Sequence, residues 1–142
     1  FSCRREALEA LRAQGVEVCD CGISQQVESA DYPDIAKEAA SRVARGECDL
    51  GVLICGSGIG MSLAANKVRG IRAAVCWNEK SAEMARRHNH ANILCLGSDF
   101  IKPQEIGPII SAWLNAKEEG GRHQRRVDKI SAIENGPCGW GA

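Results

Sequence analysis

The chain has 142 residues, of which 44% are hydrophobic and 25% are charged, and its 18 basic residues balance 18 acidic ones. These proportions predict one soluble globular domain, and the zero net charge excludes a protein that gathers nucleic acid or an anionic membrane through a global positive field. The apolar runs are far shorter than the roughly 20 residues that cross a bilayer, and no secretory signal is visible, so we expect a cytoplasmic protein.

Helix and strand patterns alternate along the chain. Helices are expected at 2–14 and 33–45 with a short strand at 16–19 between them; then come a strand at 50–55, a helix at 61–68, a strand at 71–76, a helix at 81–87, a strand at 93–96, a helix after Pro103 and a last helix at about 123–134. The strands are continuous apolar runs, which is typical of a parallel sheet covered on both faces. We therefore predict an α/β sandwich in a single domain, 1–134, followed by a frayed tail, 135–142.

The order of the elements also predicts one more strand. Doubly wound sheets usually begin with a strand, whereas this chain opens at Phe1 and continues directly into a helix. We expect that a short N-terminal piece with the first strand of the sheet precedes Phe1.

Eight cysteines raise the choice between a disulfide scaffold, a metal site and reduced thiols. No Cys-x-x-Cys pair occurs, and the spacing of Cys19 and Cys21 is wrong for a usual zinc knuckle. Half of the cysteines lie in or beside apolar strand-like runs, which favours reduced core thiols and no bound metal.

Cys55 is the most informative residue of the chain. It ends the apolar run 50–54 and is followed at once by the glycine-rich turn 56–60. A buried strand thus delivers a thiol to a place where backbone N–H groups and a helix start favour a thiolate and any oxyanion beside it. Cys76 and Cys95 also end strands, but no such turn follows them, and we expect them to be core residues.

The turn departs from three known glycine-loop motifs. The dinucleotide fingerprint needs a third glycine where Met61 stands, although Glu79 lies about where the ribose-binding acid is expected. A Walker loop fails because no Lys-Ser/Thr follows, and a cysteine phosphatase would need an arginine at Met61. A thiol beside an anion-binding turn remains, with a non-catalytic nucleotide-binding module as the alternative.

Two further groups of polar residues are candidates for function. His88 and His90 flank Asn89 where a helix gives way to a strand, although a histidine at a helix end is also stabilised by the macrodipole alone. Arg122, Arg126 and Lys129 share one helical face after a Gly-Gly break; such a face is often simply solvated, yet arginine suits bidentate contact with phosphate.

Several motifs in fixed order resemble one enzyme family. They are Asp31-Tyr32-Pro33, Cys55-Gly56-Ser57-Gly58-Ile59-Gly60-Met61-Ser62, Ala64-Ala65-Asn66-Lys67, Gly70-Ile71-Arg72-Ala73, Arg87-His88-Asn89 and Glu119-Gly120-Gly121-Arg122-His123. Together they resemble the type B ribose-5-phosphate isomerases, whose family also holds galactose-6-phosphate isomerase subunits, and the likeness runs from Phe1 to about Glu134.

The resemblance implies a Rossmann-like fold and a homodimer, or a dimer of dimers, with active sites where two subunits meet. It implies interconversion of ribose 5-phosphate and ribulose 5-phosphate through an enediolate, without a metal or another cofactor. The partner is then a small sugar phosphate, and neither nucleic acid nor a membrane is involved. Allose 6-phosphate and galactose 6-phosphate remain alternative substrates, and a family member that has lost activity and serves as an assembly partner remains a further alternative.

The resemblance also implies roles for particular residues. Cys55 would be the base that moves a proton between C2 and C1, and His88, assisted by Ser57, would open the furanose ring. Binding would fall to the backbone of Gly56, Ser57, Gly58, Ile59 and Gly60 at the enediolate oxygen, to Asn89 at the sugar, and to Arg122 and Arg126 at the phosphate.

The sequence departs from the family pattern in two places. The family's first strand ends in an Asp-His pair that helps to bind the substrate, and this chain begins after that point. In addition, Asp99 stands where the family often has a basic residue near the phosphate. Lys102, or the last helix, is expected to compensate.

Overall fold

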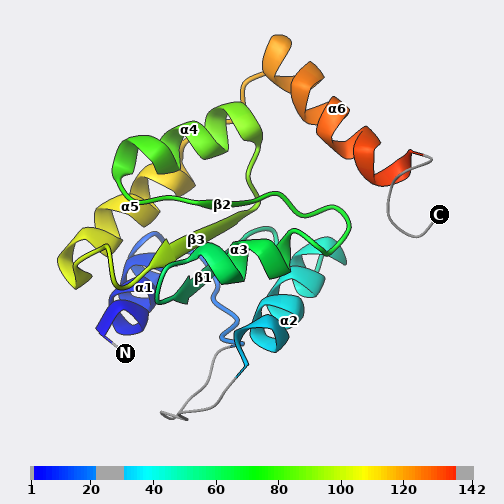
Figure 1. Ribbon diagram of the computed structural model, residues 1–142. Coiled ribbons are helices and arrows are strands. Elements are labelled where there is room, and N and C mark those ends of the chain that lie inside the picture. Colours follow the sequence, from blue (N-terminus) through cyan, green and yellow to red (C-terminus); the bar gives the residue numbers. More distant parts are fainter. Residues whose placement is uncertain (1, 22–30, 137–142) are drawn as a thin grey trace.

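The computed structural model describes residues 2–21 and 31–136 and contains one sheet of three parallel strands in the spatial order β1-β3-β2 (Figure 1). The strands are β1 (Gly51–Cys55), β2 (Ala73–Val75) and β3 (Ile93–Gly97). The helices are α1 (Ser2–Ala13), α2 (Tyr32–Ala44), α3 (Ile59–Ala65), α4 (Glu79–Asn89), α5 (Pro103–Asn115) and α6 (Arg122–Asn135).

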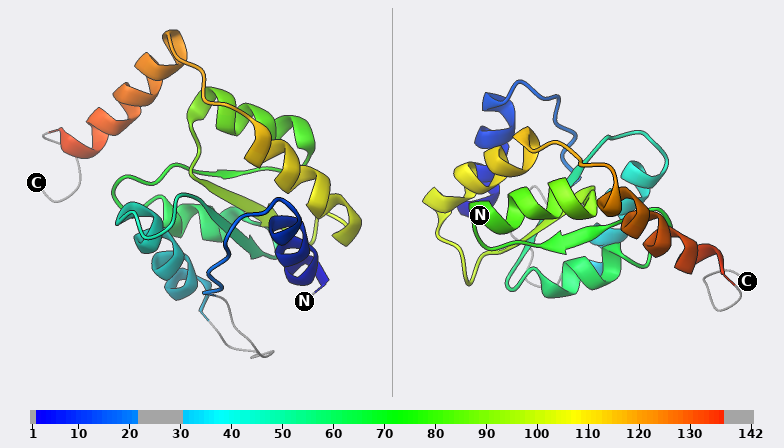
Figure 2. Two further views of the ribbon diagram at one scale, coloured as in Figure 1. Left: turned by 180° about the vertical axis from the view of Figure 1, so that it is seen from behind. Right: turned by 90° about the horizontal axis from the view of Figure 1, so that it is seen from above.

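The central strand β3 is buried on both faces, because its side chains alternate between two apolar clusters. Leu94 and Leu96 pack against α1, α4 and α5, whereas Ile93 and Cys95 pack against α2 and α3. Helices therefore cover both faces of the sheet (Figure 2), and the predicted α/β sandwich with a parallel sheet is confirmed.

The strand predicted at 16–19 is wrong, since these residues form no ladder in the described part of the chain. Residues 16–19 line one side of a pocket of about 980 Å³, and the outer edge of β1 lines another side. A strand needs a neighbour within hydrogen-bonding distance, and here the pocket separates the two segments. The strand expected before Phe1 lies outside this chain and stays a prediction.

The remaining elements match the predicted ones in kind but differ in length. β2 is shorter than the predicted strand 71–76, and at its start the side-chain amide of Asn66 bonds both the N–H and the carbonyl of Ala73, at 2.8 and 2.9 Å, as a neighbouring strand would. α3 begins two residues before its predicted start. α6 extends away from the sheet (Figures 1 and 2) and ends at Asn135, one residue beyond its predicted end. Of the frayed tail predicted at 135–142, residues 137–142 lie outside the described residues, and the tail stays a prediction.

None of the helices in the described ranges combines the length and the apolar composition that a membrane span requires.

The turn after β1 lies directly against the end of β3, and Gly97 permits this contact. A Cβ atom at Gly97 would lie 2.4 Å from the carbonyl oxygen of Ser57, which is backbone and cannot turn aside. We predict that Gly97→Ala lowers the free energy of unfolding by about 2 kcal/mol or more.

Gly107→Ala is the matched control, because the nearest atom to its Cβ would be 3.9 Å away and alanine favours a helix interior by roughly 0.5–1 kcal/mol. Urea unfolding of both variants measures the difference. Equal stability of the two variants would contradict the close contact at Gly97.

Candidate active site

Cys55 lies at the carboxyl edge of the sheet, where β1 ends beside Gly97 of β3. The Cys55 side chain is only half-buried, and its Sγ accepts the backbone N–H of Gly58 at 3.1 Å. Gly58 reaches this position in a left-handed conformation with φ of 78°, which a residue with a side chain adopts only at a cost. The turn thus aims an amide hydrogen at the sulfur atom, and an amide donor stabilises a thiolate.

The turn is held in place by the segment that follows β3. Ser98 N–H donates to the carbonyl of Cys55 and Asp99 N–H to that of Gly56, both at 2.9 Å. Within the turn, the N–H of Ile59 donates to Ser57 Oγ at 3.1 Å. The carbonyl groups of Cys55 and Gly56 are therefore hydrogen-bonded to the segment that follows β3.

Two side chains border the turn closely. A Cβ atom at Gly56 would lie 2.9 Å from an Asp99 carboxylate oxygen, and one at Gly60 would lie 2.6 Å from the Tyr32 ring. Asp99 therefore places a negative charge where the resemblance implied a basic residue. A negatively charged group would be repelled from this end of the turn.

The other two strand cysteines differ from Cys55 in burial. Cys76 is 2% exposed and Cys95 is fully buried. Burial raises the pKa of Cys76 to about 11 and that of Cys95 to about 12. Both remain neutral thiols at physiological pH, in agreement with the core positions that the sequence predicted for them.

His88 and Asn89 lie at the opposite, amino edge of the sheet. They end α4, and after them the chain turns through the buried His90, which has a left-handed φ of 49°, into β3. Asn92 in this connection accepts the N–H of Gly51, the first residue of β1, at 2.9 Å. A strand of five residues is about 13 Å long. Within one chain, Cys55 and His88 are therefore separated by about the length of a strand.

Arg122 and Arg126 lie on the exposed first turns of α6, on the same side as His88. The His123 ring between them stacks on the His88 ring with centroids 4.0 Å apart. Asn89 borders a cleft of about 420 Å³ between α6 and β2, to which α6 contributes the apolar side chains of Ile130 and Ile133. The candidate residues thus form two groups: Cys55 with the turn 56–60, and His88 with Asn89 and the two arginines.

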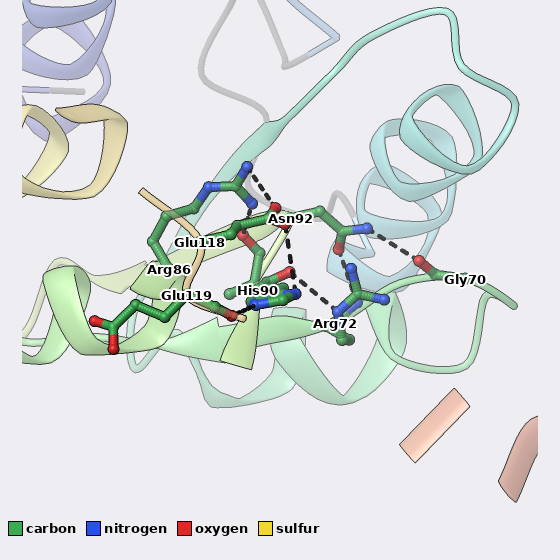
Figure 3. Close-up of polar contacts among 8 residues, drawn as sticks. Gly70, Arg72, Arg86, His90, Asn92, Glu118 and Glu119 are labelled. Carbon is green, nitrogen blue, oxygen red and sulfur yellow. Dashed lines mark hydrogen bonds and ion pairs between the residues drawn. The ribbon is translucent and has the colours of Figure 1, made fainter. Parts of the chain in front are cut away.

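Sequence reasoning missed the residues that join α6 to α4. The linker before α6 is pinned to the end of α4: Arg86 pairs with Glu118 at 2.8 Å, and His90 Nε2 bonds the carbonyl of Glu119 at 2.8 Å (Figure 3). Arg87 Nε donates to the Glu119 carboxylate at 2.6 Å. The only signal for this junction in the sequence was the four-residue spacing of Glu119 and His123. A helix that begins at about His123 did not by itself account for this polar pair.

His88, Glu119 and His123 also offer three potential metal-ligand atoms within 4.8 Å of one another. The two imidazole rings, however, are parallel to within 3°. A metal ion lies near the plane of each ring that binds it, so two parallel rings cannot share one ion unless a ring turns. His88, Glu119 and His123 are instead arranged for ring stacking and ion pairing.

The fold and the Cys55 turn place this chain among α/β proteins that bind a ligand at the carboxyl edge of a parallel sheet. Residues 1–130 match the model of the ribose/galactose isomerase family. A ribose-5-phosphate isomerase B from Escherichia coli (strain K12) is 48% identical over 134 residues, which cover 94% of this chain and 89% of that protein. The chain therefore belongs to the ribose/galactose isomerase family, as its motifs predicted.

Solved structures show the same similarity. The chain superposes on ribose-5-phosphate isomerase B from Clostridium thermocellum with a TM-score of 0.90 and 49% identity, covering 94% of this chain and 89% of that one. It superposes equally well, with a TM-score of 0.90, on the Mycoplasma genitalium enzyme with bound ribulose 5-phosphate, at 42% identity and with 95% and 90% of the two chains covered. The Rossmann-like fold implied by the resemblance is thereby confirmed.

The contrast among the three strand thiols predicts their reactivity. With iodoacetamide at pH 8 and native protein, we expect Cys55 to be alkylated well before Cys76 and Cys95, because only its sulfur is accessible and next to an amide donor. Peptide mass spectrometry over time measures the three rates. Alkylation of Cys95 as fast as that of Cys55 would contradict the burial that the structure assigns.

Proposed function

We propose that this chain interconverts ribose 5-phosphate and ribulose 5-phosphate, with Cys55 as the base. The observation that supports this most directly is the Gly58 N–H on Cys55 Sγ at the open carboxyl edge of the sheet. Family membership supports the reaction class, and the bound ribulose 5-phosphate of the Mycoplasma genitalium relative supports a five-carbon substrate. A cytoplasmic location accompanies this proposal and stays a prediction.

The reaction moves one proton between neighbouring carbons. In the open-chain aldose, the Cys55 thiolate removes the proton from C2, the electrons form the C1–C2 double bond, and negative charge develops on O1. Backbone N–H groups of residues 56–60 stabilise this enediolate, and one such donor typically lowers the barrier by about 3 kcal/mol. The hydroxyl proton of O2 then passes to O1, and the thiol returns its proton to C1 as C2 becomes the carbonyl, which yields the ketose.

Ribose 5-phosphate must first open its furanose ring. We assign this step to His88, which donates a proton to the ring oxygen while the C1–O4 bond breaks and O1 loses its proton; Ser57 assists on the thiol side. Asn89 contacts the sugar hydroxyls. Arg122 and Arg126 bind the phosphate, because their guanidinium groups match its geometry and the Asp99 carboxylate excludes it from the other end.

These assignments require two copies of the chain. Cys55 and His88 lie at opposite edges of one sheet, so the Cys55 group of one protomer must meet the His88 group of its partner. A two-fold symmetric dimer creates two equivalent sites in this way. Large apolar side chains are exposed near both groups, including Leu63 on α3 at 63% and Ile133 on α6 at 68%, and their burial would stabilise such a dimer.

Removing the thiol tests the chemistry directly. We predict that Cys55→Ala lowers kcat for ribose 5-phosphate by roughly a hundredfold to ten-thousandfold, because the proton transfer loses its base. Binding should persist, so ribose 5-phosphate should still raise the Tm of the variant. Cys48→Ser, a change at another partly buried thiol away from the turn, is the control and should keep full activity.

The same assay with allose 6-phosphate and galactose 6-phosphate decides the substrate class, and we expect ribose 5-phosphate to be the best of the three. The proposal fails if Cys55→Ala retains wild-type activity, or if the wild-type protein is stabilised by NAD and not by ribose 5-phosphate.

Mixing two inactive variants tests the shared site. Cys55→Ala and His88→Asn each remove one group from both sites of a dimer. In a mixed dimer, however, one site combines the two intact groups while the other has both defects. Unfolding and refolding an equal mixture should therefore restore about a quarter of the wild-type activity, since half of the dimers are mixed and each has one intact site.

Each variant refolded alone serves as the control and should stay inactive. If the mixture is no more active than its components although mixed dimers form, both groups must act within one chain, and the shared site is refuted.

A further inference from the structure

Glu119 and His123 contact His88, and neither has a part in the proposed reaction. The Nε2 of His88 lies 3.5 Å from the Glu119 carboxylate, an ion-pair distance, and the His88 ring is stacked on that of His123. The other Glu119 oxygen lies 3.7 Å from His123 Nε2. One carboxylate thus faces the Nε2 atoms of both imidazoles.

Glu119 itself is fixed more firmly than its partly exposed position suggests. Its N–H donates to the carbonyl of Arg87 at 2.9 Å, and its carbonyl accepts from the ring of His90. Its carboxylate receives the Arg87 guanidinium, so that backbone and side chain are both anchored to the end of α4. A residue anchored in this way fixes the direction of the imidazole beside it.

The charges of Glu119 and His123 are set by their neighbours. The hydrogen bond from Arg87 lowers the pKa of Glu119, so the carboxylate is ionised at neutral pH. Burial lowers the pKa of His123, with the positive charges of His88 and Arg122 adding to the effect, so His123 is neutral there. Glu83, Arg87 and Arg126 are the other charged groups nearby. His88 thus lies between an ionised carboxylate and a neutral stacked ring.

We propose that Glu119 and His123 are positioning residues that orient His88 for opening the furanose ring. This inference rests on the proposed function. Glu119 holds the Nε2–H of His88, and the flat face of His123 holds the plane of its ring, so that the Nδ1–H points at the ring oxygen. The proton passes from Nδ1 to O4, the C1–O4 bond breaks, and the O1 proton leaves to water, which later reprotonates His88.

Two measurements separate ring opening from the thiol step. Isomerisation of ribose 5-phosphate requires both steps. Ribulose 5-phosphate is acyclic, because the hydroxyl that would close a furanose ring on C2 bears the phosphate. Exchange of its C1 hydrogen with deuterated water therefore requires only Cys55 and the enediolate, and NMR measures its rate.

The variants are chosen as matched pairs. Glu119→Gln removes the charge beside His88, whereas Glu118→Gln removes the neighbouring carboxylate, which pairs with Arg86 and His90. His123→Ala removes the stacked ring, whereas His123→Phe keeps a flat ring without a titrating nitrogen. Circular dichroism and Tm confirm that each variant is folded.

We expect Glu119→Gln to isomerise ribose 5-phosphate roughly tenfold to a hundredfold more slowly, the loss typical when an imidazole loses the group that orients it, while deuterium exchange into ribulose 5-phosphate stays near the wild-type rate. His123→Ala should show the same split, His123→Phe should recover most of the activity, and Glu118→Gln should show no split between the two assays.

Equal losses in both assays for Glu119→Gln would overturn the inference, because they would indicate a structural role, and so would no loss in either assay. His88→Asn distinguishes this failure from failure of the proposed function. If His88→Asn shows the split and Glu119→Gln does not, only the positioning role is wrong. If His88→Asn loses nothing, the ring-opening role itself is wrong and the inference falls with it.

Discussion

The contact between the turn after β1 and the end of β3 is the constraint on which the candidate site depends. Gly97 brings the two backbones together, and the N–H groups of Ser98 and Asp99 bond the carbonyls of Cys55 and Gly56. With these carbonyls fixed, the chain turns through the left-handed Gly58, whose N–H reaches the sulfur. The chemistry proposed for Cys55 is therefore a property of two strand ends in register, and no isolated loop would have it.

Parallel topology has a second consequence for function. All strands of such a sheet end at one edge, and the helices that return antiparallel to them end at the other. Cys55 ends a strand and His88 nearly ends a helix, so the two cannot meet within one chain. The proposed dimer would bring the two groups together, and the exposed apolar residues of α3 and α6 provide surface that a second copy would cover.

The amino-edge group shows how charge is arranged around a candidate proton donor. Arg86, Arg87 and His90 anchor the acidic linker Glu118–Glu119, and this linker in turn sets the start of α6 with its arginines. The start of the cationic helix is thus held beside His88 by ion pairs and hydrogen bonds with the end of α4. Three arginines of α6 are exposed on this part of the helix.

By itself, the sequence determined the class of the fold, the order of its elements and the thiol at the strand end, because apolar runs, helix periodicity and Gly-Ser-Gly-Ile-Gly are local patterns that backbone chemistry interprets directly. It also identified the family. Only the tertiary structure decided that residues 16–19 form no strand, that Asp99 covers Gly56, and that Glu119 and His123 flank His88. These facts depend on which distant segments pack together, and contacts across 32 residues, as between Arg87 and Glu119, leave no periodic trace in the sequence.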